Sequence, residues 1–295
     1  STIEDIEMST LGRIEVIKGP SSSIYGAGLG GTIQLIPNKG LFTNRSINSK
    51  YTFGSYGLQK HVLQANLGSQ KNKAKLTYSN LHSDGYRKNN KTDRQTITIA
   101  SKHFINESNV ITLLGSYIDL KAFIPSSINE DSYLNDPTSA AFTWGRSKGF
   151  KDYKKRLFGI SWEHIYNDYT KQKTSVFTSF LNSYEPRPFN ILKENTKGVG
   201  LRTRLISKTK LFNKSLNWIL GGELFKDSNL YQTYKNVYND FPPEVGSVEG
   251  NLLSDFKEKR SYMNLFFDSN FQLSKNIIAT FGFNINATSY TLNDL

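Results

Sequence analysis

From about residue 50 to the end of the chain, apolar and polar residues alternate in stretches of roughly 10 residues. In the last stretch, Phe281, Phe283 and Ile285 alternate with Gly282 and Asn284. Successive side chains of a β-strand point to opposite faces of the sheet, so this alternation predicts strands with one apolar and one polar face. We count eleven such strands. The pattern therefore predicts an all-β, antiparallel fold.

The connections between the predicted strands alternate in length after the first hairpin, whose turn lies near residues 55–58. The short connections are 69–72, 106–109, 167–171, 209–213 and 274–276, and the long ones are 84–93, 123–153, 185–197 and 227–257. Transmembrane β-barrels have short turns at one end and long loops at the other. A soluble β-sandwich binding module, the alternative, has no reason to keep every second connection short. The alternation favours the barrel.

A different unit precedes these strands. Two β-rich runs, 13–18 and 32–36, flank a segment of Gly, Ser and Pro, and a polar linker follows at 40–49. Pro20 has no N–H to donate and stops the first run. Gly26, Gly28, Gly30 and Gly31 permit positive φ angles and close backbone approach, so residues 26–31 are expected to form a tight turn with at least one Gly at positive φ.

This segment resembles the end of the plug domain of TonB-dependent outer-membrane receptors. The matching run starts as Arg-Ile-Glu-Val, continues through Gly-Pro-Ser-Ser and Tyr-Gly, and reaches Gly-Gly before an Ile-rich strand; Pro37 departs from the family pattern. The motif residues are Arg13, Glu15, Lys18, Gly19, Pro20, Ser21, Tyr25, Gly26, Gly30 and Gly31. The run Asp-Gly-Tyr-Arg at 84–87 also resembles the family.

The resemblance implies residues 1–40 to be the C-terminal part of a plug domain and 41–295 the N-terminal half of a transmembrane β-barrel. The family barrel has about 22 strands, so about eleven are expected here, with the signal peptide and the segment that contacts TonB upstream. The implied function is active import of a scarce nutrient across the outer membrane of a Gram-negative bacterium. A ferric siderophore is the first expectation and cobalamin or another small nutrient the alternative. The implied partners are the TonB energy-coupling complex and outer-membrane lipid.

The two longest predicted loops carry aromatic and basic residues that suit a bulky, oxygen-rich chelate. The candidate substrate-binding residues are Trp144, Arg146, Lys148, Tyr231, Tyr234 and Tyr238. Large aromatic rings supply contact area, and Arg supplies directional hydrogen-bond donors. Packing between loops, or a position at the membrane interface, is the alternative role for the same residues.

Composition changes this picture little. The net charge of +12 is spread along the chain and no nucleic-acid motif accompanies it. There is no Cys, the four His are scattered, and the Gly26–Gly31 match to G-x-G-x-x-G lacks both the following helix and the acidic residue of a dinucleotide site. We therefore expect no metal, no cofactor, no nucleic acid and no enzymatic activity. The plug-like motif argues against a passive porin or a barrel enzyme.

Overall fold

The computed structural model describes residues 5–18, 24, 30–39 and 45–295. A two-stranded antiparallel sheet pairs β1 (Leu11–Lys18) with β2 (Gly31–Pro37), and the 3-10 turn η2 (Met8–Thr10) precedes β1. The two β-rich runs predicted at 13–18 and 32–36 are thus confirmed as strands. We call residues 5–18, 24 and 30–39 the N-terminal unit.

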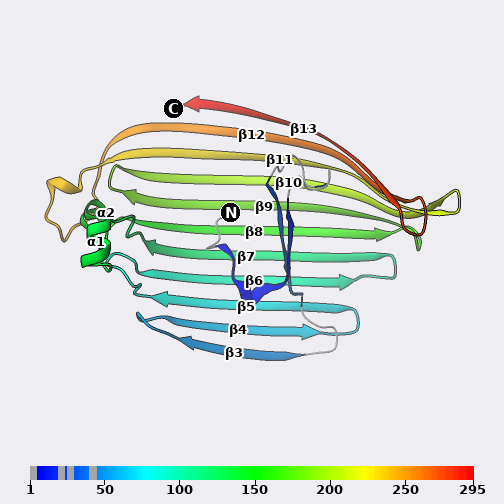
Figure 1. The fold of residues 1–295 in the computed structure, drawn as a ribbon, viewed down its shortest axis with the longest axis horizontal. Coiled ribbons are helices and arrows are strands. Elements are labelled where there is room, and N and C mark those ends of the chain that lie inside the picture. Colours follow the sequence, from blue (N-terminus) through cyan, green and yellow to red (C-terminus); the bar gives the residue numbers. More distant parts are fainter. Residues whose placement is uncertain (1–4, 19–23, 25–29, 40–44) are drawn as a thin grey trace.

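All other strands form one sheet of eleven, in which each strand pairs with its neighbours in the sequence. These strands are β3 (Ser46–Phe53), β4 (Gln59–Gly68), β5 (Asn72–Ser83), β6 (Thr92–Phe104), β7 (Asn109–Phe123), β8 (Phe150–Ile165), β9 (Thr170–Arg187), β10 (Asn190–Leu211), β11 (Lys214–Asn236), β12 (Glu249–Gln272) and β13 (Ile278–Asp294) (Figure 1). Every pairing is antiparallel. A sandwich would need two packed sheets. The predicted eleven-strand, all-β fold is confirmed.

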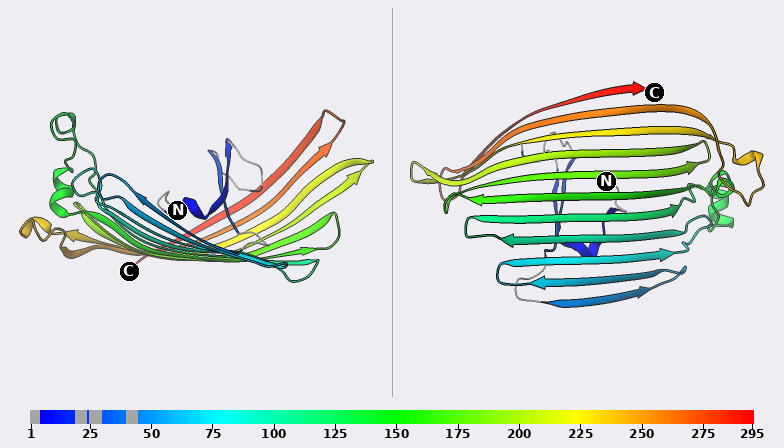
Figure 2. Two further views of the ribbon diagram at one scale, coloured as in Figure 1. Left: turned by 90° about the horizontal axis from the view of Figure 1, so that it is seen from below. Right: turned by 180° about the vertical axis from the view of Figure 1, so that it is seen from behind.

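The large sheet is strongly curved, and the N-terminal unit lies within its hollow (Figure 2, left). We call the side toward this unit the concave face and the other side the convex face. Among the described residues, no helix is long and apolar enough to cross a membrane. The two helices, α1 (Glu130–Asn135) and α2 (Phe142–Ser147), lie in one connection at an end of the sheet (Figure 1).

An apolar belt covers the middle of the convex face. Val176, Leu201 and Leu224 are direct neighbours across three strands, and Leu265 and Ile285 are paired in the next two. Cross-strand partners share a face, so the ladder gathers these side chains into one surface. The belt consists of Leu76, Ile97, Ile99, Leu113, Phe158, Ile160, Trp162, Val176, Val199, Leu201, Leu220, Leu224, Met263, Leu265, Phe281, Phe283 and Ile285, each at least 38% exposed.

On the concave face, apolar side chains are buried and several charged side chains pair with one another. Its small apolar cluster, Ile118, Leu120 and Tyr153, is almost fully buried. Elsewhere on this face the structure places Arg202 opposite Glu223, with 3.3 Å between Nη1 and Oε2. Leu201 and Arg202 are adjacent in sequence but belong to opposite faces, as the alternation predicted.

The predicted bounds of two long connections are wrong. Residues 185–197 are not a loop, because β9 and β10 remain paired up to Arg187 and Asn190 and only residues 188–189 turn. Within residues 227–257 the connection is limited to 237–248, with the turn η4 (Tyr238–Asp240), because β11 and β12 pair on both sides of it. It is shorter than expected but remains one of the long connections. The linker predicted at 40–49 is also shorter, because β3 begins at Ser46. In the segments 185–197 and 227–257, strand pairing extends beyond the apolar belt, so the alternation of apolar and polar residues does not mark the strand ends.

Candidate functional site

The N-terminal unit is attached to the concave face by buried charges. Glu7 is 2% exposed, and its two carboxylate oxygens accept hydrogen bonds from Lys60 Nζ at 2.9 Å and Arg94 Nη2 at 2.7 Å. Lys60 belongs to β4 and Arg94 to β6, so one carboxylate joins the unit to two separated strands. Charge-assisted hydrogen bonds are about twice as strong as neutral ones. Glu7 therefore anchors the unit.

A second anchor lies on β8. Asp5 accepts hydrogen bonds from Tyr153 Oη at 2.7 Å and Lys155 Nζ at 2.5 Å. Gln64 of β4 donates to the Ser9 carbonyl at 2.8 Å, and Arg202 of β10 donates to the Ile24 carbonyl at 2.6 Å. A cavity of about 300 Å³ remains between the N-terminal unit and the concave face of the large sheet. The unit is held by polar contacts around an incompletely filled interface.

The electrostatics of Glu7 depend on these partners. Burial alone would raise its pKa, but hydrogen bonds from Lys60 and Ser9, with the charge of Lys60, outweigh burial and leave the pKa below its usual value. The anchor is therefore ionised near neutral pH. Its contribution is present above the unfolded-state pKa and is lost as the pH falls through the lower folded-state pKa.

The turn glycines of the motif are not equivalent. Gly31 has φ of +117°, and a Cβ at this position would lie 2.2 Å from the Ile17 carbonyl oxygen. Gly30 has open space around the same position. The expected positive φ is thus confirmed at Gly31.

The other motif residues fall into two groups. Arg13 and Glu15 form an exposed ion pair of 2.6 Å on β1, and Lys18 ends that strand. Five motif residues lie outside the described residues: Gly19, Pro20, Ser21, Tyr25 and Gly26.

Three connections interlock at one end of the sheet. Arg87, in the 84–91 connection, donates to the carbonyls of Ser139 at 2.8 Å and Ser126 at 2.5 Å. Asn89 donates to the carbonyls of Ile124 and Gly149, each at 2.9 Å. These two residues pin both ends of the 124–149 connection. We call residues 84–91, 124–149 and 237–248 the loop cluster.

The sequence indicated Arg87 only as part of the Asp-Gly-Tyr-Arg run, and it did not indicate Asn89. Nearby, hydrogen bonds from Thr138 and Lys88 lower the pKa of Asp136. This carboxylate is exposed, so its bonds contribute little to stability.

Four of the six candidate substrate-binding residues belong to this cluster. Arg146 donates to the Phe241 carbonyl at 2.5 Å, and Lys148 Nζ donates to the Glu244 carbonyl at 2.5 Å. The Arg146 guanidinium lies 5.9 Å from the centre of the Tyr238 ring, and Tyr238 is only 6% exposed. The Trp144 ring covers Gly149. These side chains join one connection to another, which is the packing role considered above.

The remaining two candidates lie in β11 rather than in a loop, and they face opposite ways. Tyr231 is on the concave face, where its ring centre is 5.0 Å from that of Phe256. Tyr234 is on the convex face, 4.4 Å from Lys193 Nζ. The structure therefore does not bring the six candidates together. Among the described residues, no group of three or more His, Asp or Glu is close enough to hold a metal ion.

Comparison with solved structures identifies the fold. The ferric citrate transporter FecA, unliganded, superposes with a TM-score of 0.84 at 15% identity, over 98% of this chain and 45% of that one. The ferric-catecholate import receptor Fiu from E. coli K12 gives 0.76 at 15% identity, over 95% and 50%. The ferripyoverdine receptor of the Pseudomonas aeruginosa outer membrane, bound to ferripyoverdine, gives 0.81 at 14% identity, over 98% and 43%.

No protein-family model matches the sequence. At these identities the likeness establishes the fold alone, and the chain spans at most half the length of the three structures. The structures nonetheless share a single architecture, that of receptors in the bacterial outer membrane. The resemblance expected from the glycine-rich segment is thereby confirmed: this chain has the fold of part of a TonB-dependent outer-membrane receptor.

Proposed function

We propose that the chain is part of an outer-membrane transporter that imports a ferric siderophore and is energised through TonB. The single observation that carries the proposal is a charged unit held within the hollow of a curved sheet whose convex face is apolar. Such a convex face suits lipid, and a unit in the hollow suits a plug that must move before a substrate can pass. The neighbours are described as receptors or transporters of ferric complexes, which supports iron over cobalamin.

In this proposal residues 1–40 are the end of the plug and 41–295 the first half of the barrel. The polar attachment of the N-terminal unit supports a displaceable plug, because charges that separate into water regain hydration and so recover much of the energy of the broken contact. The loop cluster then lies outside the cell, since long connections of such barrels are extracellular. The substrate would meet the cluster first and the concave side of β11 next.

Tyr231 and Tyr234 provide a matched test of the substrate path. Both are tyrosines of β11, three residues apart, and only Tyr231 faces the hollow. In the full-length protein, Tyr231→Ala should raise the KM for siderophore-dependent uptake of labelled iron about tenfold, the size of one strong aromatic contact. Tyr234→Ala should leave the KM unchanged. Equal effects of the two substitutions would refute the proposed path.

Deletion of the gene tests the substrate class. Cells grown under iron limitation should lose uptake of at least one ferric siderophore and retain cobalamin uptake. If every siderophore is still imported and cobalamin uptake disappears, the iron assignment is wrong. Retained uptake of all tested nutrients would reject the transporter itself.

A further inference from the structure

A group of cations lies on the concave face at the turn end of the sheet, which is the end opposite the loop cluster. Lys73 of β5 pairs with Lys102 of β6. Lys173 of β9 pairs with Arg204 of β10. All four share a face with Arg202 through the cross-strand rows, so they face the hollow. Like charges directly opposite one another are unfavourable in a sheet, and here two such pairs occupy one surface.

Three hydroxyl groups lie between the two cation pairs. Thr112, Ser161 and Ser175 continue the cross-strand row of Lys102 across β7, β8 and β9. Ser175 Oγ donates to Ser161 Oγ at 2.9 Å. Strands lie about 4.8 Å apart, so about 14 Å separates β6 from β9. Long, flexible lysine side chains on both sides can therefore reach toward an ion held above the hydroxyls.

The N-terminal unit adds a cation from the opposite side. Lys39, which follows β2, lines a cavity of about 250 Å³ together with Lys173, Arg204 and the three hydroxyl residues. Burial and the positive charges of Lys102 and Lys73 lower the pKa of Lys39. The cavity thus lies between two parts of the molecule that both present positive charge to it.

Lys39 and Lys173 have no carboxylate of their own in the part of the chain that the structure describes. Glu163 is the one acid that acts on both of them there, and it already lies 3.3 Å from Lys171 Nζ. Repulsion between Lys39 and the sheet therefore opposes the attachment that Glu7 makes. An anion in the cavity would contact both sides and replace this repulsion with attraction.

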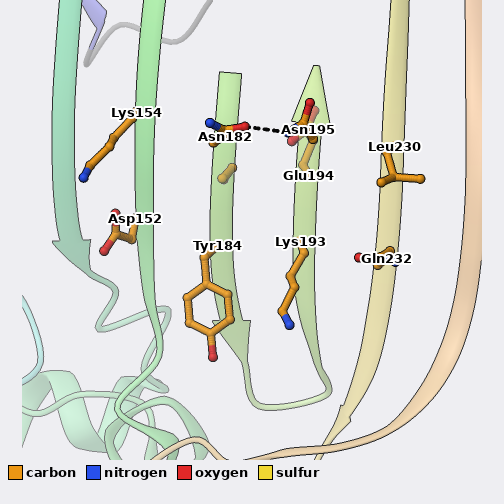
Figure 3. Close-up of a pocket in the computed structure, with 10 residues that line it drawn as sticks. Asp152, Lys154, Asn182, Tyr184, Lys193, Glu194, Asn195, Leu230 and Gln232 are labelled. Carbon is orange, nitrogen blue, oxygen red and sulfur yellow. Dashed lines mark hydrogen bonds between the residues drawn. The ribbon is translucent and has the colours of Figure 1, made fainter. Parts of the chain in front are cut away.

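A second polar pocket, of about 460 Å³, shows a different charge balance at the loop-cluster end of β8 to β11 (Figure 3). Its cations are Lys154 and Lys193. Lys193 Nζ lies 2.8 Å from Glu249 Oε2, and Lys154 Nζ lies 3.7 Å from Asp119 Oδ2. Each cation there has a carboxylate beside it, so this pocket supplies a matched control.

We propose that the cavity at Lys39 binds a small multivalent oxyanion of the inorganic phosphate class, which joins the N-terminal unit to the sheet. The ammonium groups of Lys39 and Lys173 and the guanidinium of Arg204 would surround the ion, and the hydroxyls would donate to its remaining oxygens. Hydrogen bonds from Lys and Arg to phosphate oxygens are short and strong. The site makes no use of the loop cluster, of Tyr231 or of an imported substrate.

The first test measures binding of inorganic phosphate by calorimetry, with purified full-length protein in a neutral detergent at constant ionic strength. The cavity variant carries Lys39→Gln and Lys173→Gln, and the control carries Lys154→Gln and Lys193→Gln, which removes the same charge. The cavity variant should bind phosphate at least about tenfold more weakly than the native protein. The control should bind it like the native protein. No binding by the native protein, or equal weakening in both variants, overturns the proposal.

The second test measures hydrogen exchange of residues 30–39. Phosphate should slow this exchange in the native protein and in the control but not in the cavity variant. Without phosphate the order reverses, and the cavity variant should exchange more slowly than the native protein because it lacks the repulsion. Faster exchange of the cavity variant in phosphate-free buffer would show that a carboxylate of the protein already fills the cavity, and it overturns the proposal. Neither test involves iron uptake, so the outcome leaves the proposed transport function to its own experiments.

Discussion

The two faces of the eleven-strand sheet are made from alternating residues of the same strands, yet they follow opposite rules. Leu201 lies on the convex face between Val176 and Leu224, where large apolar side chains stay exposed. Arg202, the next residue, lies on the concave face and contacts both Glu223 and the N-terminal unit. In a water-soluble protein the buried face would be the apolar one. The inversion indicates that the convex side is adapted to a non-aqueous environment.

The largest expected effect comes from placing a charge on the wrong face. Leu201→Arg in the full-length protein should destabilise the barrel by about 2–4 kcal/mol, because an arginine near the middle of a bilayer must shed water without gaining a partner. Ser261→Arg is the control, since Ser261 is exposed on the same face, two residues beyond Met263 of the belt on the side of the loop cluster. It should cost less than about 1 kcal/mol. Unfolding in urea from lipid vesicles measures both; equal costs would refute the lipid-facing assignment.

The next effect concerns the buried carboxylate on the concave side. Glu7→Gln should weaken attachment of the N-terminal unit by about 1.5–3 kcal/mol at pH 7, because Lys60 and Arg94 lose a charged acceptor. Since the pKa of Glu7 is lowered, the native protein should lose this advantage as the pH falls below the usual range for glutamate. Hydrogen exchange of residues 5–18 measures the attachment. A difference between native protein and variant that persists unchanged at low pH would contradict the mechanism.

Gly30 and Gly31 of the N-terminal unit differ in the space around them, and this difference can be tested by substitution. Gly31→Ala should cost about 1–3 kcal/mol, since its φ is positive and its new methyl group would collide with the Ile17 carbonyl. Gly30→Ala should be tolerated, because nothing occupies the corresponding space. Protease resistance of the plug region in full-length protein distinguishes the two. Equal sensitivity would show that the turn has a different geometry.

The smallest effect tests packing on the concave face. Phe177 pairs with Gly159 on one side and Gly200 on the other, but its ring covers only Gly200, where a Cβ would lie 2.2 Å from the ring. Gly200→Ala should therefore cost about 1 kcal/mol or slightly more through overpacking. Gly159→Ala has room and should be neutral. Thermal unfolding in detergent compares them, and a cost at Gly159 as large as at Gly200 would rule out this ring position.

The sequence predicted the strand number and the facing of residues such as Leu201 and Arg202, because the belt imposes a period of two. It failed beyond the belt. Between residues 185 and 197 the few apolar residues do not alternate with polar ones, so no period of two marks the strands, although the backbone hydrogen bonds continue. The same failure assigned Tyr231 and Tyr234 to a loop.

The loop contacts were less predictable still. Arg87 and Asn89 bind main-chain carbonyls that lie 35 to 60 residues away along the chain. A carbonyl is present at every residue, so its selection leaves no signature in the partner's side chain. Glu7 also finds its partners on two strands whose proximity requires the curved sheet. Local pattern could not supply these tertiary contacts.

The unequal length of the strands has a consequence for how a solute would approach the hollow. Lys226 of β11 and Leu76 of β5 lie in one cross-strand row. From this row β11 continues ten residues to Asn236, about 33 Å at the usual rise, whereas β5 continues seven residues to Ser83, about 23 Å. The edge of the sheet on the side of the loop cluster is therefore oblique. Its tall side is formed by the hydrogen-bonded strands around β11, and its low side lies at β4 to β6. Backbone hydrogen bonds hold the tall side in place, so in the proposed transporter a substrate that docks against it would cost little ordering entropy.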